Sequence, residues 1–144
     1  MDHNTNISFL IKLIGDTIET KSNKRLRPHG ITLSQERILA YLNERKDQKT
    51  SQKDMEEFFQ VTHPTIIGIL KRLESKGFIL SEVDDIDKRV RNISLSPDFE
   101  QKSGAVLSFQ KDMEKQILHD VSEVEKTMLR DNLYKLLSNV EQME

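Results

Sequence analysis

The chain has 144 residues, of which 35% are apolar and 32% are charged, and its formal net charge at pH 7 is −2. Ordinary soluble domains are roughly 45 to 50% apolar and about 25% charged. The composition therefore favours an elongated helical protein that buries its remaining apolar surface against a partner, rather than a compact monomer. The chain has no Cys, which excludes disulfides and thiol chemistry.

The charge is unevenly distributed along the chain. Residues 98–144 carry a net charge of −4, whereas residues 1–97 carry +2, so we expect an anionic partner to meet the first two thirds of the chain. No apolar run approaches the roughly 18 residues of a membrane span, and residues 1–6 do not resemble a secretion signal. We therefore expect a cytoplasmic protein that does not bind a membrane.

Apolar residues at helical spacing predict a first helix from residue 7 to about residue 25. Asn6 can cap its start, and the segment Arg27-Pro28-His29-Gly30 ends it, because Pro and Gly interrupt helical hydrogen bonding. A second helix is expected to start at a capping box formed by Thr32 and Gln35 and to continue to Leu42.

The next segment has the pattern of a helix-turn-helix. A short helix is expected from Ser51 to about Phe59, followed after a brief turn by a helix that ends near Lys76. Thr62 can cap this second helix, and Pro64 falls in its first turn, where its missing N–H costs least. The residues expected to face the core are Ile66, Ile69, Leu70 and Leu73.

The sequence from residue 78 onward predicts a hairpin and two more helices. Residues 78–80 and 90–96 are expected to be strands joined by a highly charged tip. A long helix should follow Ser96 and run to Ile117, with apolar residues about every 3.5 positions. Ser122 and Glu125 then predict the start of a last helix, which continues to Val140. The fold class is therefore mainly α with a small β-hairpin.

Several of these segments resemble the MarR family of bacterial winged-helix transcription regulators. The resemblance covers nearly the whole chain and lies in residues 61–66, in residues 71–79 and in the hairpin. The hairpin is similar to the family's signature of Asp-x-Arg, five residues and Leu-Thr, and reads Asp87-Lys88-Arg89, residues 90–94 and Leu95-Ser96. Ser96 replaces the usual Thr.

This resemblance implies a single domain over residues 1–144, built as a winged helix-turn-helix between dimerisation helices. Residues 31–97 would form the DNA-binding lobe, and residues 7–26 and 98–142 would form the dimerisation helices. A homodimer would place two helix-turn-helix units in adjacent major grooves of double-stranded DNA. Amphipathic helices outside the helix-turn-helix independently favour a partner surface.

Candidate DNA contacts on the fourth helix lie opposite its apolar stripe. Ile67 could meet a thymine methyl group, and Gly68, which costs roughly 1 kcal/mol of helix stability, could allow close approach to DNA. Thr62 and Thr65 can donate hydroxyls to phosphate, although helix capping alone also accounts for Thr62. The candidates are Thr62, His63, Pro64, Thr65, Ile67, Gly68 and Lys71.

In the hairpin, the resemblance makes Arg89 the wing arginine that enters or lines the minor groove. Lys88 and Arg91 would contact phosphates beside it, and Asp87 would orient the wing by pairing with an arginine. The alternative is an ordinary solvated hairpin tip. Asp84 and Asp85 lie close by and should weaken non-specific binding.

The resemblance also implies a small aromatic or anionic effector, and the basic segment with Arg25, Arg27 and His29 is our candidate for its site. The alternative is that this segment contacts phosphates. The four His show no zinc spacing, and no catalytic or cofactor-binding motif is present. We therefore expect neither a metal, nor a cofactor, nor an enzyme.

Together these features predict a homodimeric DNA-binding regulator, in particular a repressor that occludes a promoter by binding a pseudo-palindromic operator. Release by a small ligand would regulate it. A second hypothesis is a winged-helix module that binds proteins and no longer binds DNA, which the overall acidic balance, Gly68 and the acids near the wing favour.

Overall fold

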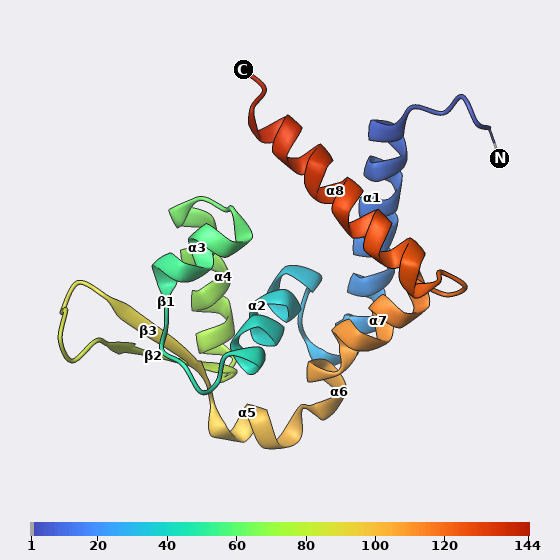
Figure 1. Ribbon diagram of the computed structural model, residues 1–144. Coiled ribbons are helices and arrows are strands. Elements are labelled where there is room, and N and C mark those ends of the chain that lie inside the picture. The colour runs from blue at the N-terminus through green and yellow to red at the C-terminus, as the bar shows by residue number, and fades with distance from the viewer. Residues whose placement is uncertain (1) are drawn as a thin grey trace. The chain divides into compact units, whose positions relative to one another are not determined.

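The computed structural model describes residues 2–144, which form a mainly α-helical chain with one small antiparallel sheet (Figure 1). This confirms the predicted fold class. The chain divides into two compact units, one ending at Ser108 and the other spanning Phe109–Glu144, and each is described by itself. The first unit contains α1 (Ile7–Leu26), the 3-10 helix η1 (Arg27–His29), α2 (Leu33–Glu44), β1 (Thr50–Ser51), α3 (Gln52–Phe59), α4 (His63–Ser75), β2 (Ile79–Val83), β3 (Arg91–Leu95), α5 (Pro97–Lys102) and α6 (Gly104–Leu107); the second contains α7 (Phe109–Ile117) and α8 (Glu123–Glu141).

The predicted caps begin the first helices. Asn6 Oδ1 accepts hydrogen bonds from the backbone N–H groups of Ser8 and Phe9, at 2.9 and 3.4 Å, and starts α1. At the start of α2, the Thr32 and Gln35 side chains each accept from the other residue's backbone N–H, at 3.3 and 3.1 Å. Between these helices η1 ends at Gly30, whose φ of 73° is in the left-handed region that favours glycine.

The helix-turn-helix consists of α3 and α4. Ser51 and Asp54 cap α3 reciprocally, with distances of 3.1 and 2.9 Å. Thr62 occupies the N-cap position of α4, but its hydroxyl lies 2.9 Å from the Thr65 hydroxyl and makes no capping hydrogen bond. The prediction that the Thr62 side chain caps the helix is therefore wrong, because its hydroxyl forms a hydrogen bond with the Thr65 hydroxyl instead of with a backbone N–H group.

The sheet has the strand order β1-β3-β2 and is antiparallel throughout. The hairpin formed by β2 and β3 is the wing, and its register pairs Ile79 with Leu95 and Val83 with Arg91. β1 is an unpredicted strand that pairs Thr50 with Ile93. Two residues are too few to show the alternation from which a strand is predicted, and this short strand joins the start of α3 to the base of the wing.

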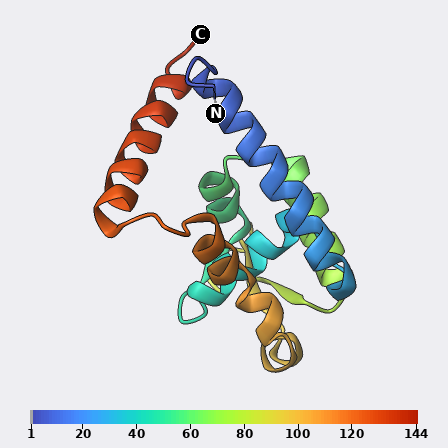
Figure 2. The same cartoon turned by 90° about the vertical axis from the view of Figure 1, so that its right-hand side faces the viewer.

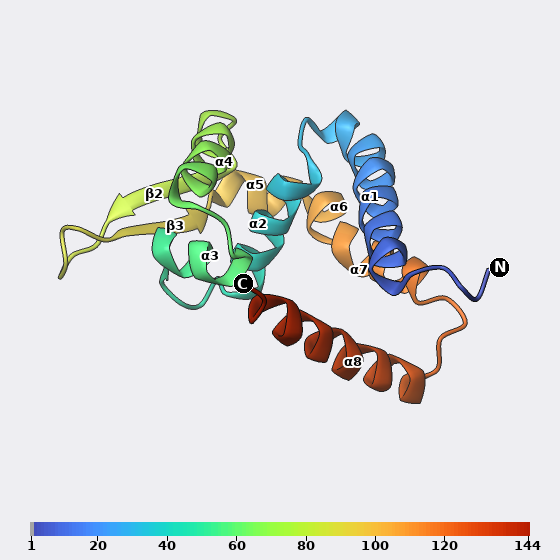
Figure 3. The same cartoon turned by 90° about the horizontal axis from the view of Figure 1, so that it is seen from above.

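A buried core holds the first unit together. α2 contacts α1, α4 and β3, and it lies between α1 and the wing in Figures 1 and 3. Each fully buried Leu, Ile or Met side chain contributes roughly 1.5 to 3 kcal/mol to the stability of the fold. Ile69 is half-buried and stands at the edge of the predicted stripe on α4. Side chains with at most 1% exposure include Leu39, Met55, Ile66, Leu73 and Ile79.

The predicted long helix after Ser96 is wrong, because three short helices, α5, α6 and α7, occupy this stretch. Ser103 leaves the helical conformation, with φ −119° and ψ 36°. Serine side chains compete for backbone hydrogen bonds, and the adjoining Gly104 lowers helix stability further. Phe99 packs on Phe78 with ring centroids 4.7 Å apart, and Val106 is buried. The apolar period therefore follows burial in the core rather than one continuous helix.

The second unit ends in α8, which Figure 2 shows as one uninterrupted helix. Ser122 caps it as predicted, accepting from the Glu125 N–H at 3.1 Å. None of the described side chains of α8 is buried. Its exposed apolar residues are Val124, Met128, Leu129, Leu133, Tyr134, Leu137 and Val140.

The helix α1 also carries an exposed apolar face. Ile7 and Ile14 expose 66% and 55% of their surface, and Phe9, Leu10, Ile11 and Leu13 are exposed as well. Neither α1 nor any other helix within residues 2–144 has both the length and the apolar character needed to cross a membrane.

Candidate nucleic-acid interface

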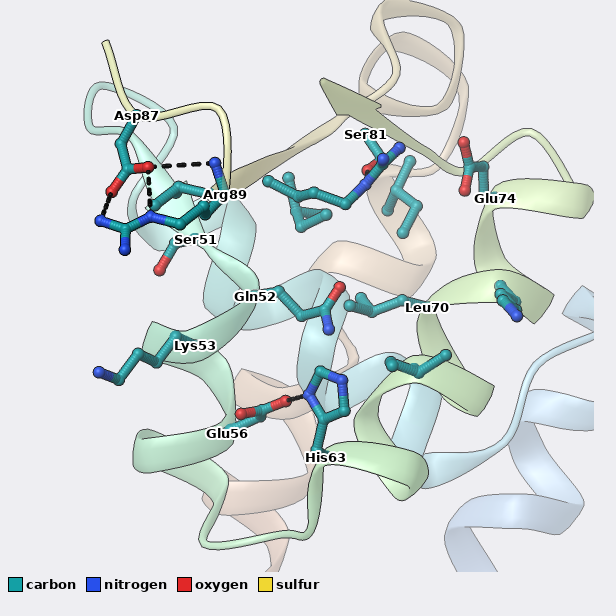
Figure 4. A pocket seen from close by; sticks show the side chains of 16 residues that line it. Ser51, Gln52, Lys53, Glu56, His63, Leu70, Glu74, Ser81, Asp87 and Arg89 are labelled. Carbon is teal, nitrogen blue, oxygen red and sulfur yellow. Dashed lines mark hydrogen bonds and ion pairs between the residues drawn. The ribbon is translucent and has the colours of Figure 1, made fainter. Parts of the chain in front are cut away.

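A groove of about 1070 Å³ lies between the helix-turn-helix and the wing (Figure 4). The start of α3 supplies Ser51, Gln52 and Lys53, while Ser81 and residues 89–91 supply the wing side. Its cations are Lys53, Lys71, Arg89 and Arg91, and its acids are Glu56, Glu74 and Asp87. The groove therefore carries a small positive excess and takes side chains from three separate segments.

One stripe of α4 lines this groove. His63, Ile67 and Lys71 are spaced four residues apart and so share one face of the helix. The buried residues Ile66 and Leu73 anchor the opposite face in the core. These three residues are among the predicted DNA contacts, and the structure brings them together along one wall.

The other predicted residues of α4 lie outside this wall. Thr62, Pro64 and Thr65 are exposed near the start of the helix, and Gly68 is half-buried. Apart from its chain neighbours and the nearby backbone of α4, a Cβ atom at Gly68 would meet no described atom within 4 Å. Packing within the chain therefore does not require glycine at this position.

Asp84 organises the tip of the wing. Its Oδ2 accepts hydrogen bonds from the backbone N–H groups of Ile86 and Asp87, at 3.1 and 3.0 Å. Its Oδ1 accepts from Asn92 Nδ2 at 2.7 Å and from Lys49 Nζ at 3.4 Å. These hydrogen bonds, led by the one from the Asp87 backbone, hold the pKa of Asp84 well below its usual range. The sequence pattern indicated Asp84 only as a charge near the wing and did not reveal these hydrogen bonds.

Asp87 fixes the Arg89 side chain. Arg89 donates from Nε to Asp87 Oδ1 and from Nη2 to Asp87 Oδ2, both at 3.1 Å, and its backbone N–H donates to Oδ1 at the same distance. This pairing lowers the pKa of Asp87 and raises the pKa of Arg89. Arg89 is 90% exposed, so a ligand can reach the guanidinium while Asp87 orients it.

The other two predicted wing residues differ in their surroundings. Arg91 donates from Nε to Ser81 Oγ at 3.0 Å and lines the groove. Lys88 is exposed at the tip and is not among the groove residues. Arg89 and Arg91 thus line the same groove as α4, whereas Lys88 lies outside it.

Six further groove residues were not predicted from the sequence: Ser51, Gln52, Lys53, Glu56, Glu74 and Ser81. The capping box at Ser51 and Asp54 indicated that a helix starts here, and a helix N-terminus favours anions. Glu56 could not be found in this way. Its partner His63 lies on the next helix, and Glu56 Oε1 accepts the hydrogen bond of His63 Nδ1 across the turn.

The candidate effector residues lie elsewhere. Arg25 belongs to the last turn of α1, and Arg27 and His29 belong to η1. All three are exposed, and none lines the groove. Among residues 2–144 there is no group of three or more His, Asp or Glu side chains that could hold a metal ion.

Known proteins share both the sequence pattern and the geometry. Residues 31–90 match the model of the MarR family. The chain is 30% identical to S. aureus MepR, seen in a crystal structure of a MepR–DNA complex, with a TM-score of 0.87 over 95% of this chain and 99% of MepR. MepR in its DNA-binding conformation gives a TM-score of 0.86 over 94% and 99% of the two chains.

A curated relative is the uncharacterised HTH-type transcriptional regulator YwoH of Bacillus subtilis (strain 168). It is 28% identical over 109 residues, which cover 76% of this chain and 77% of YwoH. Because the match to MepR spans nearly all of both chains and the family model covers the helix-turn-helix and most of the wing, the chain belongs to the MarR family of winged-helix transcriptional regulators.

Proposed function

We propose that this chain is a transcriptional repressor that binds double-stranded DNA as a homodimer at a pseudo-palindromic operator. The observation that carries this proposal is the groove between α4 and the wing. One wall presents His63, Ile67 and Lys71, and the other presents Arg89 and Arg91. A duplex offers a matching surface, because its phosphate strand separates a major groove from a minor groove.

In this arrangement α4 enters the major groove and Arg89 reaches the neighbouring minor groove, where narrow tracts concentrate negative potential. The phosphate strand between them runs along the groove. Lys53, in the first turn of α3, then faces phosphate oxygens. Ile67 contacts a thymine methyl group, and Gly68 permits close approach of the helix backbone.

The exposed apolar faces of α1 and α8 support the homodimer. Each face holds several large apolar residues that the chain itself leaves exposed, and contiguous patches of this kind mark protein interfaces. A two-fold dimer repeats the groove, so its operator has two half-sites about one helical turn apart. The DNA complex of MepR, at 30% identity, supports DNA as the partner.

The effector site remains a prediction, and one contact favours it. Lys76, the C-cap residue of α4, donates to Gly30 O and to Gln35 Oε1, the latter at 3.3 Å. The recognition helix is thereby tied to the turn that carries Arg27 and His29. An anion bound at this turn would release the operator if it favoured a different position of α4. Calorimetry with salicylate, repeated on Arg25→Ala and Arg27→Ala, tests the site: equal binding to all three proteins contradicts it.

DNA binding itself is tested by selecting duplexes from a random pool and measuring fluorescence anisotropy at two salt concentrations. We expect a selected consensus with two-fold symmetry and an affinity that falls with salt, because lysines and arginines displace counterions from phosphate. Absence of both selection and salt-dependent binding would favour the protein-interaction module. A reporter gene placed behind the selected site distinguishes a repressor from an activator.

A further inference from the structure

His63 and Glu56 meet across the turn of the helix-turn-helix. His63 Nδ1 and Glu56 Oε1 form a hydrogen bond, which Figure 4 shows within the groove. The Glu56 side chain is 20% exposed and the His63 side chain is 64% exposed. One nitrogen of the ring is therefore held by α3, while the rest of the ring stays accessible from the groove.

We propose that Glu56 positions the His63 ring and determines which DNA base this ring reads, an inference that rests on the proposed DNA-binding function. An ionised carboxylate offers only acceptor oxygens, so His63 Nδ1 must carry the hydrogen of this bond. In a neutral imidazole the other nitrogen is then a bare acceptor. While the ring is neutral, this hydrogen bond leaves His63 Nε2 as an acceptor on a ring that lines the groove.

An acceptor in the major groove needs a donor on the base edge. Adenine offers its N6 amino group and cytosine its N4 amino group, whereas guanine and thymine present acceptors there. His63 is therefore expected to select adenine or cytosine on the contacted strand. The other two residues of this stripe on α4 cannot supply this base preference. Ile67 suits a thymine methyl group, and Lys71 suits guanine or phosphate.

Two variants separate positioning from charge. Glu56→Gln removes the negative charge but keeps a side-chain oxygen that accepts from Nδ1–H, whereas Glu56→Ala removes both. A general gain in DNA affinity from the lost charge is common to the two variants. Glu57→Ala is the matched control, because Glu57 is the next residue of α3, is exposed and lies outside the groove.

The first measurement is the nitrogen NMR spectrum of the imidazole rings in the full chain without DNA at pH 8. The His63 signal is assigned by its loss in His63→Asn. We expect the Nδ1–H tautomer in the parent and in Glu56→Gln, and a shift toward the Nε2–H tautomer in Glu56→Ala. A parent ring in the Nε2–H or doubly protonated form overturns the proposal, as do identical His63 signals in the parent and Glu56→Ala.

The second measurement uses a duplex that the parent selects from a random pool, with each base pair of a half-site changed in turn. One neutral hydrogen bond corresponds to a factor of about 2 to 12 in affinity. We expect the parent and Glu56→Gln to prefer adenine or cytosine at one position by this factor, and Glu56→Ala to lose the preference. Equal discrimination by all three proteins overturns base reading by His63. If the parent binds no duplex, the proposed function and base reading both fail, whereas the ring signals still decide whether Glu56 positions His63.

Discussion

The wing tip and the helix α8 differ in how far contacts within the chain satisfy their side chains. At the wing tip, Asp84 and Asp87 bind their neighbours through hydrogen bonds within the chain. In α8, exposed Leu133, Leu137 and Val140 follow one another at helical spacing without cover from described residues. Hydrogen bonds within the chain therefore fix the proposed DNA-binding surface, whereas the apolar face of α8 would be covered only in the proposed homodimer. We accordingly expect changes in α8 to act on assembly and changes in the wing to act on binding geometry.

The largest expected effect comes from placing charge in the apolar face of α8. The double variant Leu133→Asp/Leu137→Asp should be monomeric by sedimentation, because burying carboxylates in an apolar interface is costly. Its DNA affinity should fall by about 100-fold or more, since two linked half-sites gain about 10² to 10⁴ over one. Ser138→Asp adds charge to another face of the same helix and should remain dimeric. A monomeric parent would contradict the interface.

Glu36, on α2, is a buried carboxylic acid without a hydrogen-bond partner in the part of the chain that the structure describes. It is 1% exposed, and neither carboxylate oxygen has a partner among the described residues. Burial, opposed in part by Arg37, raises the pKa of Glu36 from 4.5 to about 7. The folded chain then binds one proton more than the unfolded chain between these values, so the free energy of unfolding falls as the pH rises from 4.5 to 7.

Glu36→Gln should remove this dependence on pH. At pH 8 the variant should be more stable than the parent by about 3 kcal/mol, since each pKa unit corresponds to about 1.4 kcal/mol, and at pH 4.5 the two should be alike. Urea denaturation across this range measures the difference. Glu44→Gln, at the exposed end of α2, is the control and should follow the parent. A constant difference between Glu36→Gln and the parent at every pH would contradict the assignment.

Arg89 and Lys88 test the division of roles within the wing. Arg89→Ala should weaken binding to the selected duplex by roughly 5- to 150-fold, because it removes an oriented groove contact. Lys88→Ala should act alike on all sequences and flatten the dependence of log Kd on log salt by about one unit. Anisotropy titrations at several salt concentrations measure both. If Arg89→Ala binds as the parent does, the wing is not part of the interface.

Local signals account for what the sequence predicted correctly. Asn6, Thr32, Ser51 and Ser122 begin helices because their side chains accept from N–H groups two or three residues ahead, and such pairs are readable from spacing. The break at Ser103 was missed because the apolar period continues through it. Phe99, Val106 and Phe109 are all buried, and their spacing does not reveal that they lie on three separate helices.

Part of the candidate site was predictable for the same reason. The helical stripe of His63, Ile67 and Lys71 follows from a period of 3.6 residues. The roles of Glu56 and Asp84 depend on partners in other elements, namely His63 across a turn and Asn92 and Lys49 around the wing. From charge alone, Glu56 and Asp84 would be expected to weaken DNA binding. Their proposed positioning roles follow only from their hydrogen bonds.

The smallest expected effect is also the one that separates geometry from charge most directly. Asp84→Ala removes a negative charge from the wing and should nevertheless weaken DNA binding, by about two- to tenfold, because the N–H groups of Ile86 and Asp87 lose their acceptor. Asp85→Ala removes the same charge one residue away, from an exposed carboxylate outside the hydrogen bonds described for residues 2–144. It should leave affinity unchanged or strengthen it slightly. Amide hydrogen exchange at the wing tip should accelerate in Asp84→Ala and not in Asp85→Ala. If both variants gain affinity, simple repulsion between wing acids and phosphate governs this region, and the hydrogen bonds of Asp84 do not position Arg89.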